Sequence, residues 1–105
     1  MRILLACAMG MSTSIITELM LQEAKRQGND DIKIWAVDQG MVEEELGNFD
    51  VLLLAPQVQH TLKKMKRLVG DIPVAILRPQ DYGRCDGVAI LKFAMQLFED
   101  SHFND

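Results

Sequence analysis

A chain of 105 residues has room for one hydrophobic core but not for two, and its apolar and charged fractions, 49% and 25%, are ordinary for a folded domain. The net charge of −4 and the isoelectric point near 5.1 argue against a nucleic-acid-binding protein, because such proteins are usually basic. The two cysteines, Cys7 and Cys85, indicate neither a disulfide framework nor a zinc site, which favours a reducing cytosol.

Four apolar segments have the length and composition of β-strands. The first covers residues 2–6, and the second, residues 32–37, alternates partly between apolar and polar side chains, as a less buried strand does. Residues 51–55 are apolar throughout, which is typical of the centre of a parallel sheet. The fourth segment, residues 73–77, opens with a proline, which suits a strand start or an edge.

Helical patterns separate and follow these strands. The predicted helical segments cover residues 14–27, 41–46 (a short acidic turn or helix), 58–69 and 86–98. Residues 101–105 are expected to be a frayed tail of a single domain that spans residues 1–105. Strand–helix alternation predicts an α/β fold with a four-stranded parallel open sheet and helices on both faces. The two most apolar strands belong at the centre of the sheet, which gives the order 2-1-3-4.

Cys7 lies at the carboxyl end of the first predicted strand, where a short loop of small residues leads into the first helix. A helix start has unpaired N–H groups and the positive end of a dipole, so it favours anions. A cysteine in this place has its thiolate form favoured, and the same amides can hold a phosphoryl group on the sulfur. The candidate phosphate-binding residues form this loop: Ala8, Met9, Gly10, Met11, Ser12, Thr13 and Ser14.

The predicted topology indicates the same place independently. In open α/β sheets the ligand crevice lies beyond the strand ends where the chain reverses direction, which here is between the first and third strands. The Cys7 loop is therefore expected beside Ala55-Pro56-Gln57, which follows the third strand.

Three segments of the chain resemble one protein family. Cys7-x-x-Gly10-Met11-Ser12-Thr13-Ser14 is similar to the phosphocysteine loop of the IIB components of the lactose/cellobiose (diacetylchitobiose) type. These components belong to the phosphoenolpyruvate-dependent sugar phosphotransferase system. Ala55-Pro56-Gln57 resembles the small-Pro-Gln turn of the family, and Tyr82-Gly83-x-x-Asp86-Gly87 resembles its Tyr-Gly…Asp-Gly segment. We therefore expect Pro56, Gln57 and Tyr82 at the periphery of the site.

The resemblance implies a phosphocarrier, a phosphotransferase of the cytoplasm. In this family the cysteine takes a phosphoryl group from a phosphohistidine on a IIA protein. It then passes the group to a sugar, here expected to be a β-linked disaccharide, that enters through the membrane IIC transporter. Cys7 is then the catalytic residue, and no metal, organic cofactor, nucleic acid or direct membrane insertion is implied. The apolar run before Cys7 is also too short for the core of a lipoprotein signal.

Two alternatives remain open. Low-molecular-weight tyrosine phosphatases and arsenate-reductase-like enzymes carry a cysteine at the same place in a similar sheet. They follow it, after five residues, with an arginine that clamps the phosphate, and this chain has Thr13 there instead. The other alternative is a non-catalytic α/β interaction module, in which Cys7 is a small buried hydrophobe.

Other polar side chains have plainer interpretations. His60 is interpreted as an exposed helix residue, although it follows the third strand closely enough to approach Cys7. Cys85 is interpreted as a small hydrophobe, and Tyr82 either faces the site or packs in the core. A basic run is expected to form a solvated face that can also dock an acidic partner: Lys63, Lys64, Lys66 and Arg67.

Overall fold

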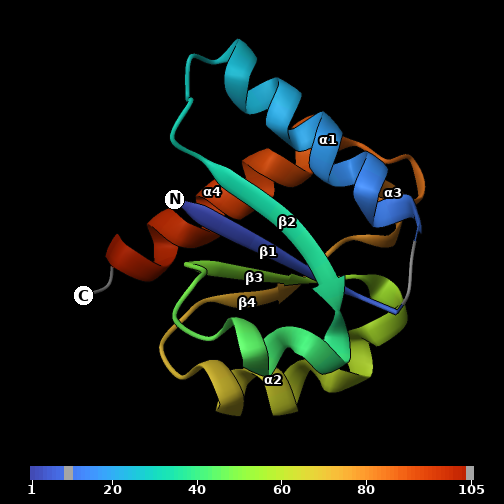
Figure 1. Ribbon diagram of the computed structural model, residues 1–105, viewed down its shortest axis with the longest axis vertical. Coiled ribbons are helices and arrows are strands. Elements are labelled where there is room, and N and C mark those ends of the chain that lie inside the picture. The colour runs from blue at the N-terminus through green and yellow to red at the C-terminus, as the bar shows by residue number, and fades with distance from the viewer. Residues whose placement is uncertain (9–10, 104–105) are drawn as a thin grey trace.

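A parallel sheet of four strands forms the centre of the molecule (Figure 1). The computed structural model describes residues 1–8 and 11–103 of the chain. The strands are β1 (Arg2–Cys7), β2 (Lys33–Asp38), β3 (Val51–Leu54) and β4 (Val74–Ile76). Their order is β2-β1-β3-β4 and every neighbouring pair is parallel, which confirms the predicted fold class and topology.

Strands β1 and β3 are the buried centre of this sheet. From Ile3 to Ala6 and from Val51 to Leu54, each side chain is at most 1% exposed. Strands covered by helices on both faces are apolar at every position, because neither face meets water. Burying one such aliphatic side chain stabilises the fold by about 1.5–3 kcal/mol. The end of β1, which carries Cys7, is therefore held by the most strongly buried part of the protein.

Helices cover both faces of the sheet (Figure 1). Helices α1 (Met11–Arg26) and α4 (Gly87–Phe103) pack against each other on one face, where α1 contacts β2 and α4 contacts β3. Helix α2 (Leu62–Val69) and the 3₁₀-helix η1 (Gln39–Glu45) lie on the other face. A second 3₁₀-helix, η2 (Pro56–Thr61), leads into α2, and the short helix α3 (Pro79–Gly83) leads from β4 toward α4.

Helix α1 begins three residues earlier than the sequence predicted. The pattern of apolar residues placed its start at Ser14, whereas the structure starts it at Met11. No glycine or proline lies between these two positions, so the chain can enter the helix directly after Gly10. The helix ends as predicted near Gly28, whose φ of +79° is a backbone conformation that glycine adopts without strain. Residues 11–14 therefore belong to the first turn of α1 and not to a loop.

The helices after β3 and β4 differ more from the prediction. The segment predicted as one helix over residues 58–69 is 3₁₀-helical up to Thr61, in η2, and α-helical from Leu62, in α2. Within η2 the chain is kinked at Val58, whose φ and ψ of −116° and 20° are not helical. The Thr61 hydroxyl donates a hydrogen bond of 2.7 Å to the Val58 carbonyl beside this kink. Helix α3 was not predicted. Pro79 is at its start, where a backbone N–H would have no partner within the helix, so the missing N–H of proline costs no hydrogen bond.

Helix α4 continues five residues beyond its predicted end at Phe98. Ser101, His102 and Phe103 are helical, so the predicted frayed tail from residue 101 is wrong for these three residues; residues 104–105 lie outside the described part. The His102 ring stacks on Phe98 and its Nδ1 lies 2.9 Å from the Phe98 carbonyl oxygen, which fastens the last turn. Within residues 1–8 and 11–103, no helix is long and apolar enough to cross a bilayer.

Candidate functional site

Cys7 ends β1 at the carboxyl edge of the sheet. In the parallel ladder it stands beside Asp38 of β2. On the other side, the Ala55 N–H donates a hydrogen bond of 2.9 Å to the carbonyl of Ala6, so the exit from β3 lies next to the end of β1. This geometry confirms the predicted closeness of the Cys7 turn and the Ala55-Pro56-Gln57 segment. Pro56, half-buried, opens η2 at this edge.

The Cys7 sulfur has two hydrogen-bond partners, a side-chain hydroxyl and a backbone carbonyl. Its Sγ lies 3.3 Å from the Thr13 hydroxyl and 3.5 Å from the carbonyl oxygen of Val37. A thiol can donate to the Val37 carbonyl, whereas a thiolate can only accept, and the Thr13 hydroxyl can donate to it. Cys7 and Thr13 are 5% and 2% exposed, so this contact is shielded from water. The Thr13 hydroxyl is therefore the side-chain group placed to donate a hydrogen bond to the sulfur.

The first turn of α1 supplies the electrostatic environment of the sulfur. Because the helix starts at Met11, the backbone N–H groups of residues 11–14 point out of its N-terminal end. This end of a helix carries a partial positive charge and favours an anion. The contact between Thr13 and Cys7 fastens that end to the strand that carries the sulfur.

The seven predicted phosphate-binding residues are thus divided between a turn and a helix. Ala8 lies exposed in the turn after β1, and Met11, Ser12, Thr13 and Ser14 form the start of α1. Met9 and Gly10 lie outside the described residues.

Tyr82, from α3, is both a packed aromatic and a neighbour of the sulfur. It is 8% exposed, and its burial raises the pKa of its phenol. The nearby Cys7 raises this pKa further, as Cys85 also does, whereas a hydrogen bond with the Gln57 side chain lowers it. The structure therefore brings Gln57 and Tyr82, both predicted at the periphery, together beside Cys7. A raised pKa keeps the Tyr82 phenol protonated at neutral pH.

Two contributors to this region were not predicted from the sequence. The Val37 carbonyl is a backbone group, and only the pairing of β1 with β2 brings it to Cys7. Cys85 is half-buried, has a φ of +51°, and lies close enough to Tyr82 to affect its pKa. The one sequence signal for Cys85 was its place inside the segment that contains Tyr82.

The remaining candidates lie apart from the sulfur or on the surface. His60 is exposed on η2, as its plainer interpretation predicted, and the basic run on α2 is exposed along its length. In the part of the chain that the structure describes, no three His, Cys, Asp or Glu side chains gather into a set that could hold a metal ion.

Solved structures of two IIB proteins share this fold. The lactose-specific IIB component domain of the phosphotransferase system from Streptococcus pneumoniae superposes with a TM-score of 0.81 at 19% identity, over 91% of this chain and 95% of that one. At 19% identity, this superposition shows that the two proteins share a fold and shows nothing further. The cellobiose-specific IIB component from Borrelia burgdorferi superposes with a TM-score of 0.79 at 33% identity, over 96% of this chain and 94% of that one.

Relatives of similar length show the same likeness in sequence. The oligo-β-mannoside-specific EIIB component of Bacillus subtilis is 32% identical, over 91% of this chain and 94% of its own length. The galactose-specific and cellobiose-specific EIIB components of Lactococcus lactis are each 34% identical, over 90% of this chain and 94% of their own length. The family model of the lactose/cellobiose-specific IIB subunit of the phosphotransferase system matches residues 2–93. The chain therefore belongs to the lactose/cellobiose-specific IIB family of the sugar phosphotransferase system.

Proposed function

We propose that this chain is a phosphocarrier in which the Cys7 sulfur receives a phosphoryl group from a phosphohistidine on a IIA protein. It then passes the group to a sugar bound by a membrane IIC transporter. Proteins of its family are phosphotransferases of sugar uptake that work with IIA and IIC proteins, which supports this assignment. The observation that carries the finer proposal is the buried contact of 3.3 Å between Cys7 Sγ and the Thr13 hydroxyl at the start of α1.

In the first step the Cys7 thiolate attacks the phosphorus of the phosphohistidine, in line with the P–N bond. The S–P bond forms, the P–N bond breaks, and the imidazole nitrogen leaves with the electron pair. Such transfers depend on positioning and charge stabilisation. The Thr13 hydroxyl is placed to donate a hydrogen bond to the attacking sulfur, and the unpaired N–H groups at the start of α1 are available to bind the oxygens of the transferred group.

In the second step a sugar hydroxyl attacks the same phosphorus. The P–O bond forms, the P–S bond breaks, and the proton of the hydroxyl goes to a base on the sugar-binding side. The sulfur leaves as a thiolate and again accepts the hydrogen bond of Thr13. A group that stabilises the thiolate therefore assists both steps, because the sulfur is the nucleophile in the first and the leaving group in the second.

A carrier must protect its phosphoryl group from water. Position 13, where the phosphatases have an arginine, bears a threonine, so the first turn of α1 supplies no guanidinium to clamp a transition state of hydrolysis. This feature favours transfer over hydrolysis.

The relatives support a proposal for the sugar and for the location. Two of them are named for oligo-β-mannoside and cellobiose, which supports a β-linked disaccharide as the sugar. A IIB chain that meets a IIA protein and the inner side of a IIC transporter works in the cytoplasm, and we assign this chain to that compartment.

Intact-mass spectrometry tests the proposal. The purified chain is incubated with phosphoenolpyruvate, enzyme I, the histidine phosphocarrier and a IIA protein, beside Cys7→Ser and Cys85→Ser variants. We expect one phosphoryl group on the wild-type chain and on Cys85→Ser, none on Cys7→Ser, and a peptide map that places it on Cys7. A Cys7→Ser chain that still gains the group in transfer would contradict the assignment.

A further inference from the structure

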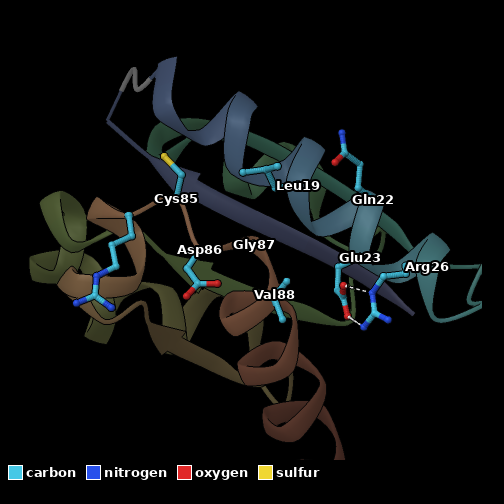
Figure 2. A pocket seen from close by; sticks show the side chains of 9 residues that line it. Leu19, Gln22, Glu23, Arg26, Cys85, Asp86, Gly87 and Val88 are labelled. Carbon is cyan, nitrogen blue, oxygen red and sulfur yellow. Dashed lines mark hydrogen bonds and ion pairs between the residues drawn. The ribbon is translucent and has the colours of Figure 1, made fainter.

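Three arginines at the surface of this protein each have a carboxylate partner. Arg26 lines a cavity of about 550 Å³ between α1 and the start of α4, where the Glu23 carboxylate accepts hydrogen bonds of 2.7 and 2.6 Å from its guanidinium (Figure 2). The other two ion pairs are Arg2 with Asp50 and Arg78 with Asp81. The positive charges at these three places are therefore balanced within the protein.

Helix α2 carries four cations that have no such partner, and we call them the basic surface. All four are exposed, and among residues 1–8 and 11–103 no carboxylate forms an ion pair with any of them: Lys63, Lys64, Lys66 and Arg67. Neither α2 nor η2 can supply a partner, because residues 51–70 contain no aspartate or glutamate. The exposed Glu43 and Glu44 of η1, on the same face of the sheet, leave these cations unpaired as well.

The basic surface belongs to a chain that is otherwise acidic. Outside it, the chain has seven lysine and arginine residues against fifteen aspartate and glutamate residues. Lys63, Lys66 and Arg67 are three and four positions apart, so they share one face of the helix, and they border one surface hollow. The opposite face is fixed, because Met65 and Val69 are buried in the core. Helix α2 therefore holds its cations outwards and cannot turn its apolar face to a partner.

The composition of the basic surface favours a diffuse anionic partner over a protein. The centre of a protein–protein interface is enriched in aromatic residues and arginine and depleted of lysine. Here three of the four cations are lysines, and none of the exposed large apolar side chains among the described residues lies on η2 or α2. Lysine is a hydrated point charge on a flexible stem, which suits attraction without a fixed geometry. A layer of anionic lipid headgroups offers attraction of that kind.

We infer that the basic surface binds anionic lipid headgroups of the membrane that holds the IIC transporter. The choice of a membrane rests on the proposed function, in which the second step brings the Cys7 sulfur to a sugar in that transporter. Helix α2 follows η2, and η2 begins with Pro56 at the edge of the sheet where Cys7 lies. Contact with lipid through α2 therefore keeps the edge that carries Cys7 close to the membrane.

The expected binding is electrostatic and reversible. Each lysine or arginine beside an anionic membrane raises the partition coefficient about fivefold. The attraction extends over about one Debye length, roughly 10 Å at 0.1 M salt, so it weakens as salt is added. Because the apolar face of α2 stays in the core, insertion of this helix into the lipid adds nothing to the binding.

Sedimentation with sucrose-loaded vesicles tests the inference. At low salt the wild-type chain should partition onto vesicles of equal parts phosphatidylglycerol and phosphatidylcholine, but not onto phosphatidylcholine alone, and salt at about 1 M should release it. The variant Lys63→Gln/Lys66→Gln/Arg67→Gln should have a partition coefficient about a hundredfold lower, because three cations are lost. Glutamine has nearly the helix propensity of lysine and arginine, so α2 should remain folded.

A matched control removes the same charge from other surfaces. It is the variant Lys25→Gln/Lys33→Gln/Lys92→Gln, which replaces three exposed lysines of α1, β2 and α4. Both variants lower the net charge of the chain by three, so a general effect of net charge would change both equally. We expect the control variant to partition almost as the wild-type chain does.

Vesicle binding needs no phosphoryl transfer, so its outcome is separate from that of the proposed function. Equal binding to the two kinds of vesicle, or equal partitioning of the two triple variants, would overturn the lipid inference and leave the proposed function standing. The same holds if the α2 variant keeps its vesicle binding but accepts a phosphoryl group from the IIA protein far more slowly than the control variant, since the basic surface would then dock a protein. A chain that binds the vesicles as expected but gains no phosphoryl group in the mass measurement would overturn the proposed function alone.

Discussion

Replacing Gly87 with alanine tests the close contact between α4 and α1. Gly87 opens a helix, where alanine is normally more favourable than glycine by about 0.5–1 kcal/mol. Here the new Cβ would come within 2.6 Å of the Leu19 Cβ and 2.8 Å of two backbone atoms, so the two helices must separate. Overpacking of this kind costs about 1–3 kcal/mol. We predict a net loss of roughly 1–2 kcal/mol in the free energy of unfolding.

The assay is urea unfolding at neutral pH, with thermal unfolding as a second measurement. For a domain of this size, 1 kcal/mol corresponds to a fall of roughly 4–8 °C in Tm. Gly83→Ala is the matched control, because Gly83 is exposed and a Cβ there meets no atom within 4 Å. That variant should keep its stability to within about 0.5 kcal/mol or become slightly more stable. A Gly87→Ala chain as stable as Gly83→Ala would refute the contact.

Three further predictions concern the site and its surroundings. Thr13→Val should slow single-turnover phosphorylation of Cys7 by about tenfold to a hundredfold, the effect of losing a hydrogen bond to a charged sulfur, whereas Thr13→Ser should keep most of the rate. Tyr82→Phe should lower the free energy of unfolding by about 1 kcal/mol, because the hydrogen bond with Gln57 is lost; a urea midpoint equal to that of wild type would contradict this. The pKa of Glu23 is lowered to about 2, mainly by the hydrogen bond from Arg26. The Glu23 carboxylate therefore stabilises the fold above about pH 4.5, and this stabilisation is lost as the pH falls toward 2. Glu23→Gln should therefore unfold with a weaker acid dependence than wild type, as measured by urea midpoints between pH 7 and pH 3.

The sheet could be predicted from the sequence because its order depends on how apolar each strand is. The two most apolar segments are the central strands β1 and β3, whose side chains other than that of Arg2 are almost completely buried. Once that order is known, the carboxyl ends of β1 and β3 must meet, which placed Cys7 beside Ala55 and Pro56. These features follow from patterns that extend over a whole strand.

Helix boundaries were less predictable because they depend on single residues. Residues 11–14 suit a loop as well as the first turn of a helix, since serine and threonine side chains can bond nearby backbone groups in both. The kink at Val58 is accompanied by a hydrogen bond from the Thr61 hydroxyl, and the extension of α4 by contacts of His102 with Phe98. These local features leave the apolar periodicity of the sequence unaltered, and the helices were predicted from that periodicity.

The detailed chemistry of the site could not be read from the sequence for a related reason. The Thr13 contact requires α1 to start at Met11, and the Val37 contact involves a carbonyl that every residue has. The place of Cys85 depends on α3, which was not predicted, and on an unusual positive φ. The sequence could therefore predict where the Cys7 sulfur lies in the fold, but not the groups that surround it.

A label chase distinguishes a chain that carries a phosphoryl group from one that hydrolyses its own phosphate ester. The chain is phosphorylated with radiolabelled phosphate, purified, and mixed either with unphosphorylated IIA protein or with membranes that contain the IIC transporter and its sugar. For a carrier, we expect the label to leave Cys7 and to appear on the IIA protein in the first mixture and on the sugar in the second. Label released as inorganic phosphate at the same rate with and without these partners would contradict it.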